Sequence, residues 1–324
     1  MPVDLRIEIS RYLERRFGLN YDAEKEIIVT VGGSEGIDLA FRAMLNPGDE
    51  VIIPEPCYVS YVPCVTLADG VPVTVNLKEE NDFKLTKEQL LSAITPRTKI
   101  LVLAFPNNPT GAVMTKEELE EIAQVVKEKD IFVVSDEIYA ELSYGNTRHC
   151  SIASIDGMKE RTIVINGFSK AHAMTGWRLG YACGPEVIIK QMLKIHQFAI
   201  MCAPTNSQYA AVEALRECDD AVEEMRNEYD RRRRFMLSKL RGMGLKVFEP
   251  YGAFYIFPNI AEFGLTSDEF ATRFLTEEKV AVVPGTAFGD CGEGFLRMSY
   301  ASSLSNLKTA MERLEKFIDR LRNK

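Results

Sequence analysis

Residues that commonly reveal metal sites or disulfide frameworks are scarce in this 324-residue sequence. It has three histidines and one tryptophan, and its seven cysteines are scattered singly with no CxxC pair. A structural zinc site needs clustered cysteine and histidine ligands, and small secreted domains need paired cysteines at a high density. The sequence therefore indicates neither class, and we expect reduced thiols and no metal.

Long apolar runs and an excess of positive charge are also missing. No run reaches the ~18 apolar residues that a membrane helix needs, and residues 2–10 (PVDLRIEIS) lack the apolar core of a signal peptide. We therefore expect a cytoplasmic protein. The 39 basic and 47 acidic residues give a net charge of -8, which disfavours nucleic acid or an anionic membrane as the main partner. Small molecules or other proteins are the expected partners.

The one dense basic run is formed by the four arginines 231–234. Glu228 lies four residues before Arg232, and Asp230 lies four residues before Arg234. Opposite charges at this spacing pair on the surface of a helix. We therefore interpret the run as a solvated helix face and not as a nucleic-acid site.

The first two thirds of the chain alternate short apolar runs with longer helical patterns. Continuous apolar runs are typical of parallel strands that are covered on both faces, with helices as the crossover connections. The predicted strands are residues 26–31, 50–54, 71–75, 99–105, 131–135 and 162–168. We predict one large α/β domain over residues 1–215, with a leading helix in residues 1–20.

The remaining residues, 216–324, have a different pattern. A long helical stretch from about Ser207 to Arg241 leads into it, and four short apolar runs then mix with two helical segments. The runs are GLKVFEP, GAFYIFP, VAVVPG and FLRMSYA, and the helical segments are SDEFATRFLTEE and LSNLKTAMERLEKFIDRL. This pattern predicts a smaller C-terminal α+β domain.

Polar residues follow five of the predicted strands at the points where the strands end. The carboxyl ends of parallel strands form one edge of a sheet, and ligands of open α/β sheets bind at that edge. The segments are GGSEG (32–36), PEPCYVSY (54–61), PNNPTG (106–111), DEIY (136–139) and SK (169–170). Each alone is explained by a helix cap or a turn, but together they predict a binding site.

A phosphorylated ligand fits this edge, although the usual phosphate motifs are missing. GGSEG is not GxGxxG, and no GxxxxGK[ST] occurs, so neither a Rossmann nor a P-loop site is indicated. Free N–H groups at the start of a helix near Ser34 can still hold a phosphate. Ser169 and Arg178 can add hydrogen bonds, because a guanidinium fork matches phosphate oxygens.

These segments, together with SKAHAMTGWRLGY and FLRMSYA, occur in the order and spacing of a known family. From about Leu5 to the C-terminus the chain resembles the class I/II aminotransferases, which are fold-type-I enzymes dependent on pyridoxal 5'-phosphate (PLP). The nearest subgroup is the bacterial and archaeal aspartate or aromatic aminotransferases. The resemblance implies a mostly parallel seven-stranded sheet sandwiched by helices, a role in amino-acid metabolism and a homodimer.

The resemblance also implies a role for each site residue. Lys170 would form a Schiff base with PLP and shuttle the substrate α-proton. Asp136 would hold a proton on the pyridine nitrogen, and Tyr139 would hydrogen-bond the phenolic oxygen. The other implied residues are Gly33, Ser34, Ser169 and Arg178 on the phosphate, Tyr58 on the ring face, Asn108 on the phenolic oxygen and substrate, and Arg297 on the substrate carboxylate.

The expected reaction is transamination between an L-amino acid, aspartate or aromatic, and a 2-oxo acid, with 2-oxoglutarate favoured. Two alternatives stay open: a C–S β-lyase or other PLP enzyme on the same fold, and an inactive truncated PLP-binding protein. Members of the family carry roughly sixty further residues ahead of the Leu5 region by this resemblance, so we expect the chain to be N-terminally truncated relative to them.

Overall fold

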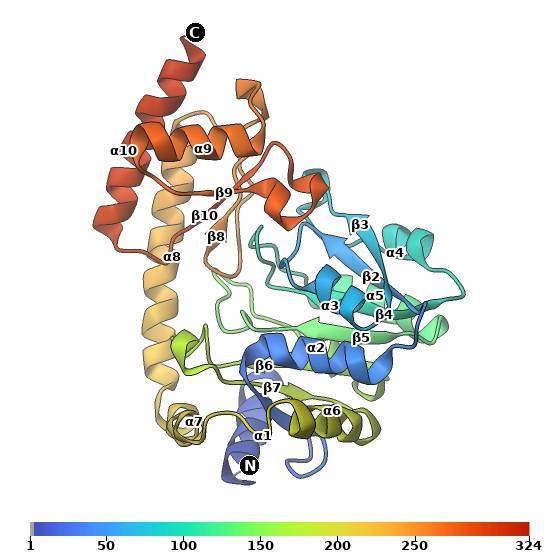
Figure 1. Cartoon of the computed structure of the whole chain (residues 1–324). Coiled ribbons are helices and arrows are strands. Elements are labelled where there is room, and N and C mark those ends of the chain that lie inside the picture. Colours follow the sequence, from blue (N-terminus) through green and yellow to red (C-terminus); the bar gives the residue numbers. More distant parts are fainter. Residues whose placement is uncertain (1–2, 324) are drawn as a thin grey trace.

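The computed structural model describes residues 3–323 and contains two β-sheets (Figure 1). The larger sheet comprises β1 (Ile27–Thr30), β2 (Glu50–Glu55), β3 (Val71–Asn76), β4 (Thr98–Ala104), β5 (Phe132–Asp136), β6 (Thr162–Gly167) and β7 (Gly180–Cys183). The smaller sheet comprises β8 (Tyr255–Ile256), β9 (Val283–Pro284) and β10 (Leu296–Ser299). The α-helices are α1 (Val3–Phe17), α2 (Gly32–Met44), α3 (Tyr61–Leu67), α4 (Lys87–Ala93), α5 (Lys116–Glu128), α6 (Glu186–Ala199), α7 (Thr205–Glu217), α8 (Asp219–Gly242), α9 (Ser267–Glu278) and α10 (Leu304–Arg322).

The larger sheet has the strand order β1-β7-β6-β5-β4-β2-β3. The pairs β2–β3, β2–β4, β4–β5 and β5–β6 are parallel, whereas β7 is antiparallel to both β1 and β6. The predicted α/β fold with a mostly parallel sheet is therefore confirmed. All six predicted strands form, and their carboxyl ends meet at one edge. The predicted strands did not include β7, a four-residue strand that begins at Gly180, at the end of the SKAHAMTGWRLGY motif.

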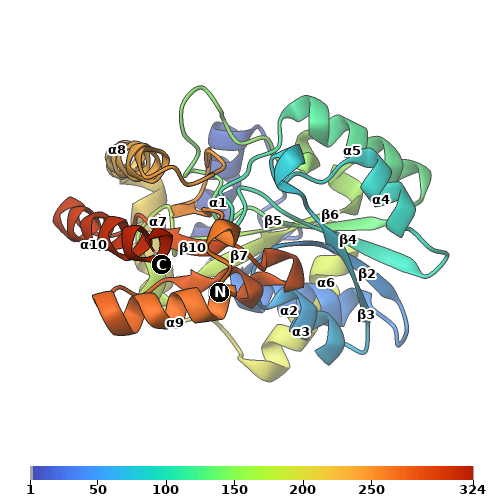
Figure 2. The ribbon, with the colours of Figure 1, turned by 90° about the horizontal axis from the view of Figure 1, so that it is seen from above.

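Helices cover both faces of the larger sheet (Figure 2). Alternate strand residues point to opposite faces, so Ile28 and Ile53 pack with α2, α3 and α6, whereas Ile27 and Ile52 pack against the opposite helix layer. That layer consists of α1, α4, α5 and α7. Each fully buried large aliphatic side chain contributes roughly 1.5–3 kcal/mol to folding. The rigid sheet thus fixes the positions of the loops at its carboxyl edge.

The smaller sheet packs with the C-terminal helices. Buried residues of β8 and β10 form one apolar cluster with residues of α8, α9 and α10, and α8 runs along one side of the molecule in Figure 1. The strands of this sheet are shorter than the apolar runs that contain them, and the GLKVFEP run forms only a single bridge, between Val247 and Pro258. The predicted helix from Ser207 to Arg241 is two helices, interrupted at Cys218. The division into residues 1–215 and 216–324 stays a prediction.

The arginine run on α8 pairs as its spacing indicates. Arg232 contacts Glu228 at 2.7 Å, and Arg234 contacts Asp230 at 3.1 Å. Within residues 3–323, no helix is both long and apolar enough to cross a membrane. In the same residues, no three His, Cys, Asp or Glu side chains are grouped closely enough to hold a metal ion.

Candidate active site

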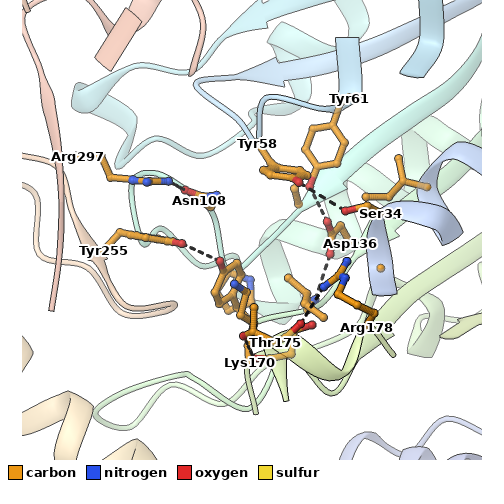
Figure 3. Close-up of a pocket in the computed structure, with 17 residues that line it drawn as sticks. Ser34, Tyr58, Tyr61, Asn108, Asp136, Lys170, Thr175, Arg178, Tyr255 and Arg297 are labelled. Atoms are coloured by element: carbon orange, nitrogen blue, oxygen red, sulfur yellow. Dashed lines mark hydrogen bonds between the residues drawn. The ribbon is translucent and has the colours of Figure 1, made fainter. Parts of the chain in front are cut away.

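A cavity of about 310 Å³ lies at the carboxyl edge of the larger sheet and is partly walled by the smaller sheet (Figure 3). Pockets of a few hundred Å³ are typical of small-molecule sites. The structure brings all ten residues predicted from the sequence to this one cavity. These residues are Gly33, Ser34, Tyr58, Asn108, Asp136, Tyr139, Ser169, Lys170, Arg178 and Arg297.

Asp136 is the last residue of β5, and its carboxylate is buried at the cavity floor. The Tyr61 hydroxyl donates to Asp136 Oδ2 over 2.7 Å, and the Ile138 N–H donates to Oδ1 over 3.1 Å. Burial raises the pKa of Asp136, and these two hydrogen bonds oppose that rise without cancelling it. A buried carboxylate in this position is poised to pair with a positively charged ligand atom.

Lys170 follows β6 and lies half-buried in the same cavity. Its Nζ atom is 5.6 Å from the ring centroid of Tyr139 and 5.3 Å from that of Phe254. Burial lowers the pKa of Lys170 most, and the Arg297 cation lowers it further. Arg178 lowers the pKa of Lys170 less than Arg297 does, and Asp136 acts in the opposite direction. The lowered pKa favours the neutral, nucleophilic amine.

Gly33, Ser34, Ser169 and Arg178 form one end of the cavity, which we call the phosphate cup. Gly33 and Ser34 belong to the first turn of α2, where unpaired N–H groups and the helix dipole favour an anion. The Ser34 hydroxyl lies 3.5 Å from that of Tyr58. Arg178 donates to the Thr175 carbonyl over 3.0 Å.

Two glycines that the sequence analysis did not single out permit this cup. Gly32 has φ +76, a left-handed conformation that glycine adopts freely, and the Arg178 guanidinium lies against it. Gly180 packs directly against the backbone of Gly32. A Cβ atom at position 180 would lie only 2.5 Å from the Gly32 carbonyl carbon. A side chain at position 180 would therefore push β7 away from the turn before α2.

Arg297 and Asn108 lie across the cavity from the phosphate cup (Figure 3). Arg297 comes from β10 and donates to Asn108 Oδ1 over 3.0 Å. Its guanidinium carbon lies 4.4 Å from the ring centroid of Tyr255 and 4.7 Å from that of Phe288. The Tyr255 hydroxyl is 3.0 Å from that of Tyr139. The smaller sheet therefore contributes a fixed cation to the cavity.

Seven lining residues were not predicted from the sequence: Ile37, Tyr61, Ala104, Pro106, Ile138, Thr175 and Tyr255. Tyr61 lies in the same PCYVSY motif as Tyr58, and Tyr255 lies in GAFYIFP. The sequence indicated these two tyrosines only as polar residues within their motifs. Which of them faces the cavity depends on how each loop folds, and the sequence does not show that.

The cavity suits a planar, phosphorylated, nitrogen-containing cofactor such as PLP. An anion site at a helix start, a buried carboxylate and an amine of lowered pKa share one cavity. The glycines at the cup let two backbone segments approach each other closely, as a phosphate-binding turn requires. These residues form the chemical set that the predicted cofactor needs.

Comparisons with known proteins agree on one family. The family model for aminotransferase class I and II matches residues 2–314. An aspartate aminotransferase of Pyrococcus abyssi is 49% identical over 317 residues, covering 97% of this chain and 82% of the relative. An aromatic-amino-acid aminotransferase of Thermococcus litoralis is 46% identical over 318 residues, covering 98% and 82%. The solved structure of an aromatic aminotransferase from Pyrococcus horikoshii matches with a TM-score of 0.97 at 48% identity, covering 99% of this chain and 86% of that chain.

Proposed function

Because the chain belongs to the class I and II aminotransferase family, we propose that it uses PLP to transfer an amino group from an L-amino acid to a 2-oxo acid. The supporting observation is that Asp136, Lys170 and the phosphate cup line one cavity. Its family membership makes it an aminotransferase, and the cofactor, the substrates and the residue roles are the proposal. The cytoplasmic location expected from the sequence stays a prediction.

Each cavity residue has a defined task in this proposal. When bound, PLP supplies an electron-accepting ring that stabilises negative charge at the substrate α-carbon. Asp136 would hold a proton on the ring nitrogen, and the Lys170 amine would hold the cofactor covalently and move the substrate α-proton. Tyr139 and Asn108 would hydrogen-bond the phenolic oxygen, and Tyr58 would cover the ring face.

Arg297 is proposed to bind the substrate α-carboxylate, which orients the bond that breaks. Of the cavity-lining residues between 3 and 323, only Lys170, Arg178 and Arg297 carry positive charge. The first two are assigned to the cofactor, so this lining offers no second cation for an aspartate side chain. Tyr255 suits an aromatic side chain, and we propose an aromatic amino acid as the donor. 2-Oxoglutarate stays the expected acceptor by family resemblance, and its second carboxylate would need a cation from outside this lining.

The proposal is tested by mixing the PLP-loaded protein with each of the twenty amino acids and measuring the oxo acid produced. We expect a visible absorbance change and oxo-acid release without ammonia, with a higher kcat/KM for phenylalanine or tyrosine than for aspartate. Release of pyruvate and ammonia from cystathionine would instead support the β-lyase alternative. Failure to bind PLP would contradict the proposal.

Replacement of Arg297 by methionine should affect both substrate binding and Lys170. Loss of two charged hydrogen bonds should raise KM for amino acids by about 10²-fold. Because the Arg297 cation lowers the pKa of Lys170, its loss should raise that pKa and shift the pH midpoint of PLP attachment upward. Arg297→Lys keeps the charge but not the fork, so it should raise KM without moving the midpoint. An unmoved midpoint in Arg297→Met would contradict the electrostatic link.

Replacement of Tyr61 by phenylalanine should change how PLP binding depends on pH. The Tyr61 hydrogen bond lowers the pKa of Asp136 against the effect of burial, so its removal should raise that pKa further. Asp136 must be ionised to pair with the ring nitrogen. As the pH is lowered, the PLP affinity of Tyr61→Phe should therefore begin to fall at a higher pH than that of the unmodified protein. Tyr58→Phe, which removes a hydroxyl that does not contact Asp136, is the matched control. Equal pH curves for all three proteins would contradict the role of Tyr61.

The protein is further proposed to act as a homodimer, with the interface beside the cavity. Large apolar side chains are exposed at the end of α6: Phe198 at 93%, Ile200 at 47% and Met201 at 79%. Trp177, next to Arg178, is 46% exposed, and its carbonyl accepts from Ser207 in α7. Exposed apolar groups gathered at one place are typical of interaction surfaces. A second copy there would cover the loop that carries Arg178.

Sedimentation of a Phe198→Asp variant tests this interface. A buried, unpaired carboxylate is costly, so the variant should sediment as a monomer at concentrations where the unmodified protein is dimeric. Leu275→Asp is the control, because Leu275 is 50% exposed on α9 and lies outside the proposed interface. If both variants stayed dimeric, the end of α6 would not be the interface.

A further inference from the structure

Glu35 places a carboxylate in the first turn of α2, the turn proposed above to hold a phosphate. Its neighbours Ser34 and Ile37 line the cavity, but Glu35 does not. Glu35 Oε2 instead accepts a hydrogen bond from the N–H of Val31, the residue before the helix. This contact resembles a capping box, in which an early helical side chain secures the backbone at the helix start.

A buried histidine holds the other oxygen of this carboxylate. His196 on α6 is fully buried, and its Nδ1 atom lies 2.6 Å from Glu35 Oε1. The two residues are 161 positions apart, and they meet because α2 and α6 pack on the same face of the larger sheet. His196 Nε2 is buried without a hydrogen-bond partner among residues 3–323. Among the described residues, the contact with Glu35 is therefore the only hydrogen bond of this imidazole.

The position of Glu35 has an electrostatic consequence for the cup. An anion near the N-terminus of a helix is favourable, and a carboxylate there competes with a phosphate for the same N–H groups. A carboxylate bound to both Val31 N–H and His196 is kept out of the cavity and steadies the turn. Without His196, the side chain of Glu35 would have one contact instead of two and could rotate toward the phosphate.

We propose that His196 is a positioning residue for the phosphate cup, acting through Glu35. It orients the carboxylate that fixes the turn between β1 and α2, so that the N–H groups of that turn face the phosphate. The inference rests on the proposed function, because it assumes that the cup holds the phosphate of PLP. In this role His196 would touch neither the cofactor nor the substrate.

Binding of PLP and of pyridoxal, which lacks the phosphate, to the cofactor-free protein tests the proposal. In His196→Leu, the dissociation constant for PLP should rise about 10- to 100-fold, a range typical when a group that orients binding residues is lost. The constant for pyridoxal should change less than about twofold, because the rest of the cavity is intact. His196→Asn, whose amide can donate to Glu35, should recover most of the PLP affinity.

Two further variants keep the test decisive if His196→Leu folds poorly. Glu35→Ala removes the contacts with both Val31 and His196, so alone it should weaken the binding of PLP more than that of pyridoxal. Adding His196→Leu to it should weaken PLP binding by less than about threefold more, as expected for residues that act through one another. His172→Leu removes another histidine, whose two buried ring nitrogens lack partners among the described residues. It should not distinguish PLP from pyridoxal.

The outcomes separate this inference from the proposed function. Equal losses for PLP and pyridoxal in His196→Leu, or no loss for either, would overturn the positioning role while leaving the cofactor assignment intact. A full loss on adding His196→Leu to Glu35→Ala would overturn the route through Glu35. Failure of the unmodified protein to bind PLP would overturn the proposed function and this inference together.

Discussion

The Lys170→Ala protein should fold, bind PLP without covalent attachment and lose transamination almost completely. It lacks both the nucleophile and the group that moves the α-proton, so kcat/KM should fall by about 10⁴-fold or more, the upper range for loss of a general base. Absorbance spectra and oxo-acid release measure the two losses. Lys194→Ala, which removes an exposed lysine on α6, is the control. A Lys170→Ala protein that still transaminates would refute the assignment.

Stability should show that this loss is not caused by unfolding. The pKa of Lys170 is lowered in the folded state, so at neutral pH the unfolded chain binds the proton more tightly and the charged lysine opposes folding. The cofactor-free Lys170→Ala protein should therefore unfold at the same or a higher temperature than the unmodified protein near pH 7. The difference should shrink as the pH approaches the ordinary lysine value, where the cost of the charge disappears.

The Asp136→Asn protein should bind PLP but catalyse slowly. Removing one partner of a buried ion pair costs about 3–5 kcal/mol. When the transition state bears this whole cost, kcat falls by roughly 10²- to 10⁴-fold. PLP affinity should fall less, because the phosphate cup and Lys170 remain. Asp136→Glu, which keeps the charge, is the comparison. Equal losses in kcat and in PLP affinity would count against the role of Asp136 in stabilising charge on the ring.

The larger sheet was predictable because most of its strands are buried on both faces and so appear as continuous apolar runs, although the edge strand β3 is largely exposed. Five of them, including β5 and β6, end in polar segments, and that placed the cavity at the correct edge. The missed strand, β7, is only four residues long and begins at Gly180, a weak strand former. The strands of the smaller sheet have two to four residues, so pattern alone overestimated their length.

The site was predictable to the level of motifs but not of contacts. The polar residues that follow the strands reach the cavity because the strands run in the same direction, which places their carboxyl ends at one edge of the sheet. The Tyr61 bond to Asp136 and the Arg297 effect on Lys170 depend on distances between residues that are far apart in the sequence. The Glu35 contact with His196 arises only when two helices pack on the same face.

Borohydride reduction of the PLP-loaded protein, followed by peptide mass spectrometry, tests most directly whether Lys170 carries the cofactor. Reduction makes the bond between PLP and the lysine nitrogen permanent, so the modified peptide can be sequenced. We expect the added phosphopyridoxyl mass on Lys170 in the unmodified protein and no such mass in Lys170→Ala. Labelling of a different lysine while Lys170 stays unmodified, or no labelling at all, would contradict the proposed active site.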